Sequence, residues 1–179
     1  MAVPNPQNTS EPTAPVQAVP DVSYQVNRSK LIHVLQMAYS GEKSAALAYQ
    51  GHAASKVKMD EREMIRKIEQ EEWDHRDKVG QMLAEVQAEP SGCREIMQVL
   101  IGRFIKIICP WCGWRLPMLG AWLLEENNIE EYARAAGYAS AMGLMAMADE
   151  LRVMSTVERE HAEYFRGVFM ASFRRQPAK

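Results

Sequence analysis

Apolar residues recur every three to four positions along most of the chain, which is the spacing that places them on one face of an α-helix. The pattern is interrupted at Pro90 and again at Pro110, where helices are expected to end. No segment shows a convincing alternation of apolar and polar residues of the kind that predicts a β-strand. The pattern predicts four long helices and one shorter, more apolar helix, over residues 29–57, 60–89, 93–108, 116–141 and 143–173. We therefore expect an all-α fold, a four-helix bundle with an additional connecting helix.

The two ends of the chain lack this pattern. Residues 1–27 are rich in Pro, Ala, Val, Gln, Asn and Ser, a composition that favours a disordered N-terminal tail. Residues 174–179 are predicted to form a short basic C-terminal tail. One helical-bundle domain over residues 28–173 remains, and it is long enough to bury a sizeable core.

Composition excludes some classes of function. The net charge of the 179-residue chain is −2, whereas a nucleic-acid-binding domain needs a basic excess, so we expect no nucleic-acid partner. The first residues carry no apolar signal-peptide core, and the three cysteines are an odd number. These features favour a reduced, cytoplasmic compartment.

Two Glu-x-x-His pairs are the first sign of chemistry. They are Glu72 with His75 and Glu158 with His161, and three positions on a helix bring both side chains of a pair to one face. The chain has four histidines, and two of them follow a glutamate in this way, more than its glutamate content would give by chance. His33 and His52 have no such glutamate, and we expect them to be structural or exposed.

A second pair of glutamates repeats the pattern in both halves of the chain. Glu42 lies 30 residues before Glu72 and Glu125 lies 33 residues before Glu158. Each is followed seven residues later, nearly two helical turns, by a tyrosine on its own face, Tyr49 or Tyr132. The chain therefore consists of two similar helical hairpins. The tyrosines are candidate catalytic residues beside an oxidising centre, with core packing as the alternative.

Glutamate and histidine in this arrangement predict a dinuclear metal site. Four buried carboxylates would repel one another without cations, and two divalent ions would balance their charge. Carboxylate and imidazole ligands suit iron, with manganese as the alternative. A Glu from each of two helices and a Glu-x-x-His from each of the other two is the ligand set of ferritin-like di-iron and di-manganese bundles. We expect the ligands to be Glu42, Glu72, His75, Glu125, Glu158 and His161, although Glu126 competes with Glu125, while Glu71 and Asp74 are expected to be solvated.

Four stretches, "GEKSAALAYQG", "EEWDH", "EENNIEEY" and "EREH", resemble the demethoxyubiquinone hydroxylase family, the ferritin-like di-iron monooxygenases of ubiquinone biosynthesis. The resemblance covers residues 30–165. It implies two iron ions bound by the six residues above, with Glu72 and Glu158 bridging, and the O₂-dependent hydroxylation of a hydrophobic quinone-like substrate. Two alternatives remain open: a rubrerythrin- or ferritin-like peroxidase, oxidase or iron-handling protein, and a non-catalytic helical module. The electron donor and the formation of a homodimer are also left open.

Residues 96–124 are the most apolar part of the chain, but Arg103, Lys106 and Arg115 interrupt the run, which is too short for a spanning helix. This stretch is either a buried connecting helix or a peripheral contact with the inner face of a membrane. Within it, Cys109 and Cys112 form a CPWC motif. We expect a structural turn there, with a regulatory disulfide or a metal clip as the alternatives.

Overall fold

A computed structural model describes residues 21–55 and 58–174. Within these residues the secondary structure is helical throughout, and no strand occurs. The elements are α1 (Val22–Ala54), α2 (Met59–Glu85), α3 (Gly92–Ile108), the 3₁₀ turn η1 (Cys109–Trp111), α4 (Arg115–Ala141) and α5 (Met145–Arg174). The prediction of an all-helical bundle is confirmed.

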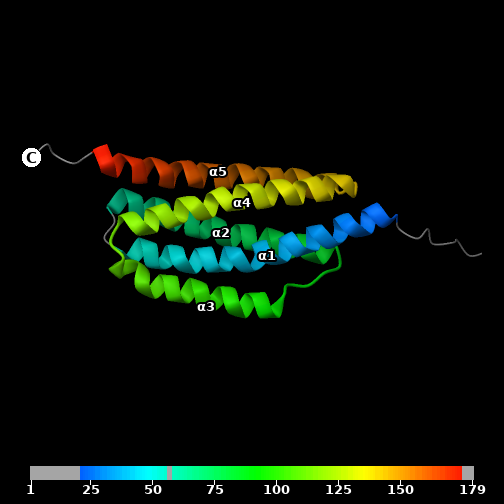
Figure 1. The fold of residues 1–179 in the computed structure, drawn as a ribbon, viewed down its shortest axis with the longest axis horizontal. Helices are drawn as coiled ribbons and strands as arrows, with labels where there is room; N and C mark the ends of the chain where they lie inside the picture. Colours follow the sequence, from blue (N-terminus) through cyan, green and yellow to red (C-terminus); the bar gives the residue numbers. More distant parts are fainter. Residues whose placement is uncertain (1–20, 56–57, 175–179) are drawn as a thin grey trace, which may run out of the picture.

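The four long helices form two antiparallel hairpins that lie side by side (Figure 1). α1 packs against α2, α4 packs against α5, and α1 also contacts α4. Helix α3 lies along the outside of α1 and carries the chain back along the bundle, so that α4 starts at the end where α2 starts (Figure 1). This return passage aligns the two hairpins lengthwise, which brings the midpoints of all four long helices to one level.

The apolar core is divided into two clusters along the bundle. Leu35, Leu83 and Leu151 belong to one cluster, and Ile65 and Phe165 belong to the other. On each long helix the residues of the two clusters are separated by about two turns (α1) or three turns (α2, α4 and α5) that carry buried polar side chains. A polar layer therefore lies in the middle of the bundle, closed off from water by apolar packing on both sides.

The interpretation of residues 96–124 as a buried connecting helix is wrong for α3. Gly102 is the single buried residue of that helix, and Leu100 and Phe104 are 62% and 63% exposed. Gly102 marks the line of contact with α1, because a Cβ at this position would lie 2.7 Å from the backbone oxygen of Ser44. The glycine lets the two backbones approach closely, and the larger apolar side chains of α3 are left on its outer face.

Helix α1 starts earlier than the sequence pattern predicts. Residues 22–27, assigned above to the N-terminal tail, are helical, and the Ser23 hydroxyl donates a hydrogen bond of 2.7 Å to Asp21 at the start of the helix. Most of these positions are exposed, so this turn shows no one-sided apolar pattern. Residues 1–20 and 175–179 lie outside the described residues. No helix between residues 21 and 174, residues 56 and 57 excepted, is both long and apolar enough to cross a bilayer.

Candidate metal centre

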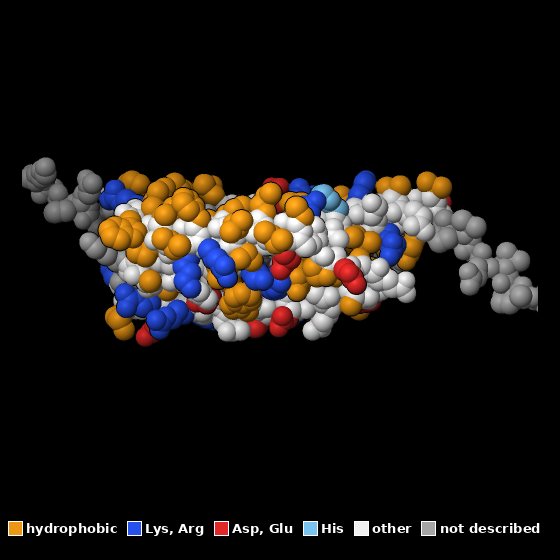
Figure 2. Space-filling view, turned by 90° about the horizontal axis from the view of Figure 1, so that it is seen from below, with side chains coloured by type: hydrophobic (Ala, Val, Ile, Leu, Met, Phe, Trp, Pro, Cys, Tyr) orange, Lys and Arg blue, Asp and Glu red, His pale blue; other side chains and the backbone are white. Residues whose placement is uncertain are grey.

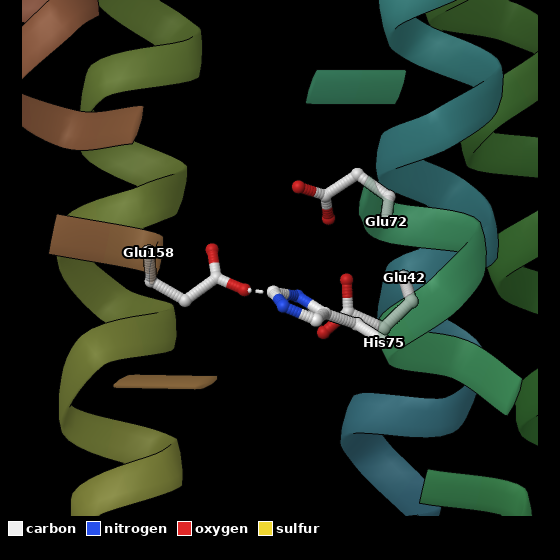
Figure 3. Close-up of side chains that lie close together, drawn as sticks. All are labelled: Glu42, Glu72, His75 and Glu158. Carbon is white, nitrogen blue, oxygen red and sulfur yellow. Dashed lines mark ion pairs between the residues drawn. The ribbon is translucent and has the colours of Figure 1, made fainter. Parts of the chain in front are cut away.

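The six predicted ligands meet in the polar layer of the bundle. Glu42 comes from α1, Glu72 and His75 from α2, Glu125 from α4, and the last pair, Glu158 and His161, from α5. None of them is more than 4% exposed. They form two overlapping groups whose potential ligand atoms lie within 4.8 Å of one another: Glu42, Glu72, His75 and Glu158, and Glu72, Glu125, Glu158 and His161. Figure 3 shows the first group, with its side chains directed towards a common space.

Polar atoms in this space have no hydrogen-bond partner. Both carboxylate oxygens of Glu72 are unsatisfied, as are His75 Nδ1 and His161 Nδ1. His75 Nδ1 lies 2.8 Å from Glu158 Oε1 (Figure 3), but the two atoms are not aligned for a hydrogen bond. Buried polar groups without partners are rare and costly. Because these atoms converge, one metal ion could bind several of them at once. The residues of the cluster therefore fit a bound metal ion.

The electrostatics of the cluster favour a cation. Burial, together with the charges of neighbouring glutamates, raises the pKa of Glu72 and that of Glu125 well above the ordinary value for a carboxyl group. Burial raises the pKa of Glu158 to about 8. These three carboxyl groups therefore resist ionisation in the apolar interior, and bound cations would reverse this effect by stabilising the carboxylate form.

The two tyrosines connect the hairpins. Each lies on the same helix face as its own glutamate, but its hydroxyl donates a hydrogen bond to the glutamate of the other hairpin: Tyr49 to Glu125, and Tyr132 to Glu42. Burial, followed by the charge of the bonded glutamate, raises the pKa of both phenols well above the ordinary value. Both hydroxyls therefore remain protonated at neutral pH and hold the carboxylates in place. Their catalytic role remains a prediction.

Glu71 was expected to be a solvated neighbour, and this is wrong. Its carboxylate lies 3.0 Å from His161 Nε2, and Lys67 pairs with its other oxygen at 3.0 Å. Partial burial raises the pKa of Glu71, but the hydrogen bonds from Lys67 and His161 outweigh this and hold it below its ordinary value. An Nε2–H donated to Glu71 leaves the lone pair on His161 Nδ1, which faces the carboxylates. The equivalent position in the other hairpin is Val157, so His75 has no such partner there.

Asn128 is the second residue that the sequence analysis missed. Its amide nitrogen lies 3.4 Å from Glu125 Oε2 and 3.4 Å from Glu158 Oε2, and it connects these two carboxylates. The sequence did contain a signal for Asn128, because a residue three positions after Glu125 lies on the same helix face. Of the two neighbouring glutamates, Glu125 lies in the cluster, whereas Glu126 is exposed and accepts a hydrogen bond from Trp122.

The cluster can be approached from one side of the bundle. A groove of about 340 Å³ runs between α1, α3 and α4. A hollow of about 30 Å³ that touches Glu42 shares four lining residues with this groove: Gly41, Leu124, Asn128 and Glu131. A small molecule in the groove would therefore be separated from the carboxylates by only a few side chains.

The remaining histidines lie outside both ligand groups. His33 is exposed and His52 is buried. The arrangement of the other six residues could hold a metal ion, and its two overlapping groups offer two adjacent positions. The chain matches no protein-family model, no curated protein and no solved structure.

Proposed function

We propose that this protein is a ferritin-like di-iron monooxygenase that uses O₂ to hydroxylate a hydrophobic, quinone-type substrate. The observation that carries the proposal is the six-residue cluster of buried glutamates and histidines with its converging, unsatisfied atoms. The order of the helices and the contribution of each helix to the cluster agree with the ligand set of ferritin-like bundles.

Iron suits the ligand set, because carboxylates and imidazoles bind Fe(II) and a carboxylate can bridge two ions. Glu72 and Glu158 belong to both groups of potential ligands, which makes them the proposed bridges. Glu42 and His75 would complete one position, and Glu125 and His161 the other. Four glutamates and two divalent ions leave the buried layer without net charge.

Two Fe(II) ions held by these residues would supply the two electrons for the reduction of O₂. With two protons taken from the solvent, one oxygen atom would enter a ring C–H bond and the other would leave as water. The protein provides the surroundings. Tyr49 and Tyr132 hold two of the carboxylates, Glu71 orients His161, and the apolar clusters on both sides keep out bulk water. A dry site of this kind prevents side reactions of an oxidising centre.

The test has two stages. The full chain, loaded anaerobically with Fe(II), should bind about two iron ions, and a count well below this value would contradict the proposal. The loaded and reduced protein, exposed to O₂ in the presence of a short-chain demethoxyquinone, should release a hydroxylated product, detected by mass spectrometry with ¹⁸O₂. Rapid consumption of peroxide without any quinone product would instead support the rubrerythrin-like alternative.

The outer face of α3 supports a peripheral contact with a lipid surface. Its exposed side chains Leu100, Phe104 and Ile107 lie among the basic residues Arg103 and Lys106. Figure 2 shows apolar and basic side chains intermixed on this side of the molecule. An apolar stripe flanked by cations is typical of helices that lie in the interface of an anionic membrane.

Phe104→Glu should therefore reduce the binding of the protein to anionic vesicles several-fold in a co-sedimentation assay, because it introduces a negative charge into the apolar stripe. Val153→Glu is the matched control: Val153 is 54% exposed but lies on α5, and its replacement should leave binding unchanged. Equal binding by both variants and the wild type would contradict the membrane contact.

A further inference from the structure

A second cavity lies next to the metal centre and is unused by the chemistry described so far. It has a volume of about 300 Å³ and lies between α1, α3, η1 and α4. Its wall is mainly aliphatic, with Ile105, Ile108 and Leu116 among its residues. The polar side chains in the wall are those of Tyr49 and His52, together with the two thiols of the CPWC motif.

His52 is an unusual residue for an apolar wall. It is 2% exposed, and its Nε2 atom has no hydrogen-bond partner. The ring stacks on Phe165 at a centroid distance of 5.9 Å, which fixes its orientation. Burial lowers the pKa of His52 to about 4, so the ring is neutral at pH 7 and offers one N–H donor and one lone pair. An imidazole that is held rigidly but left without a partner is suited to a ligand.

Tyr49 connects the cavity with the metal centre. Its ring lies 6.5 Å from that of His52 and lines the cavity, while its hydroxyl bonds to Glu125. A ring in the cavity would therefore be one side chain away from a proposed iron ligand.

We propose that this cavity holds the ring of an apolar, oxygen-bearing substrate, and that His52 forms the hydrogen bond that orients it. The inference rests on the proposed function and identifies where its substrate binds. The volume is at the lower end of the usual range for ligand pockets, roughly 300–1,000 Å³, so it suits a single substituted ring. A long apolar tail would leave past Leu116 and Leu124, which line the cavity and are 59% and 38% exposed.

The Cys109 thiol in the wall is compatible with a quinone ring. Both cysteines are free, and they occupy a turn in which the Cys112 N–H donates to the Cys109 carbonyl at 3.1 Å. Burial, with a smaller contribution from Cys112, raises the pKa of the Cys109 thiol to about 11. Only a thiolate adds readily to an electrophile, so this thiol would remain inert beside a quinone. The turn supports the structural interpretation of the CPWC motif.

The test compares two probes of the same shape, duroquinone and durene, which differ by the two ring oxygens. Binding to the full chain is measured by equilibrium dialysis. His52→Phe keeps the ring stacked on Phe165 but removes the polar atoms, and it should weaken duroquinone binding about 3- to 10-fold while leaving durene binding unchanged. His52→Gln, which restores a donor and an acceptor, should recover most of the loss.

A pair of glycine variants on α4 locates the binding site. A Cβ at Gly120 or at Gly137 meets no atom within 4 Å, and leucine favours a helix over glycine, so both variants should fold. Gly120 lines the cavity and Gly137 does not. Gly120→Leu should therefore weaken the binding of both probes, whereas Gly137→Leu should leave it intact.

Three results would overturn the inference: duroquinone binding that is insensitive to His52→Phe, an equal loss for both probes, or normal binding by Gly120→Leu. Iron is counted on the same preparations, which separates this inference from the proposed function. If the protein binds two iron ions but its duroquinone binding does not depend on His52, the proposed ring-binding site is contradicted and the di-iron proposal is not. If duroquinone binding depends on His52 but the chain takes up no iron, the ligand site is supported and the proposed monooxygenase function is contradicted.

Discussion

Replacing Glu72 by alanine is expected to abolish the proposed metal centre, reducing bound Fe(II) from the expected value of about two ions per chain to none detectable by anaerobic titration. Glu72 belongs to both groups of potential ligands, and both of its oxygens are without other partners. One substitution therefore removes a ligand from both metal positions. The helix should persist, because alanine is the best helix former, and circular dichroism of the variant should match that of the wild type.

Two other variants on α2 make this result specific. Asp74→Ala removes a carboxylate that is exposed and accepts a hydrogen bond from Gln70, and it should leave both metal ions bound. Glu71→Gln weakens the partner of His161 and should lower metal affinity about 10- to 100-fold without abolishing binding. A Glu72→Ala protein that retains two tightly bound ions would show that the cluster is not the metal site.

The architecture was predictable wherever one face of a helix is buried. The long helices α2 and α5 follow the apolar repeat closely, since each presents one side to the core. The repeat is absent at residues 22–27, because most of these side chains are exposed and the helix has no buried face there that would require apolar residues. It is also misleading for α3, whose apolar side chains suggested burial although their stripe faces outwards. An apolar helix face indicates that burial is favourable, but the sequence alone does not show whether the face packs against the protein core or against another surface.

The candidate site was predictable to the extent that it depends on local spacing. Glu-x-x-His places two side chains on one face whatever surrounds the helix, which identified four of the six proposed ligands. Glu42 and Glu125 were identified by the matching spacing in the two halves of the chain. The contacts of Glu71 with His161 and of Tyr49 with Glu125 depend on the relative register of different helices. That register is set by long-range packing, which no repeat within one helix encodes. Sequence reasoning therefore identified the proposed ligands and missed a residue that orients them.

Without metal, the protein is expected to lose stability as the pH rises from about 5 to 8. In the unfolded chain a glutamate titrates near 4.3, whereas burial and neighbouring glutamates raise the pKa of Glu72 and Glu125 in the folded state, and burial raises that of Glu158 to about 8. Below the unfolded pKa both states are protonated, and folding carries no penalty. Above the unfolded pKa, the folded state retains protons that the unfolded state has released. Each retained proton lowers the free energy of unfolding by about 1.4 kcal/mol per pH unit, until the pH passes the folded pKa.

The measurement is the thermal midpoint of the full chain in a chelator, followed across this pH range. A fall on the order of 10 °C is expected for each proton that the folded state retains across this range. Glu125→Gln should flatten the dependence because one of the buried titrating groups is gone. Glu126→Gln is the matched control on the next residue: its side chain is exposed, and the slope should not change. A midpoint that stays constant or rises in the chelator would contradict the buried cluster.

Loading with metal should reverse the sign of this dependence. Cations compete with protons for the same oxygens and nitrogens, so metal affinity, and the stability it contributes, increases as the pH rises. A non-catalytic bundle whose Glu-x-x-His pairs were ordinary surface charge would show neither the fall in chelator nor its reversal by metal. Opposite slopes from one chain would therefore be evidence that its buried carboxylates are arranged for cations rather than for protons.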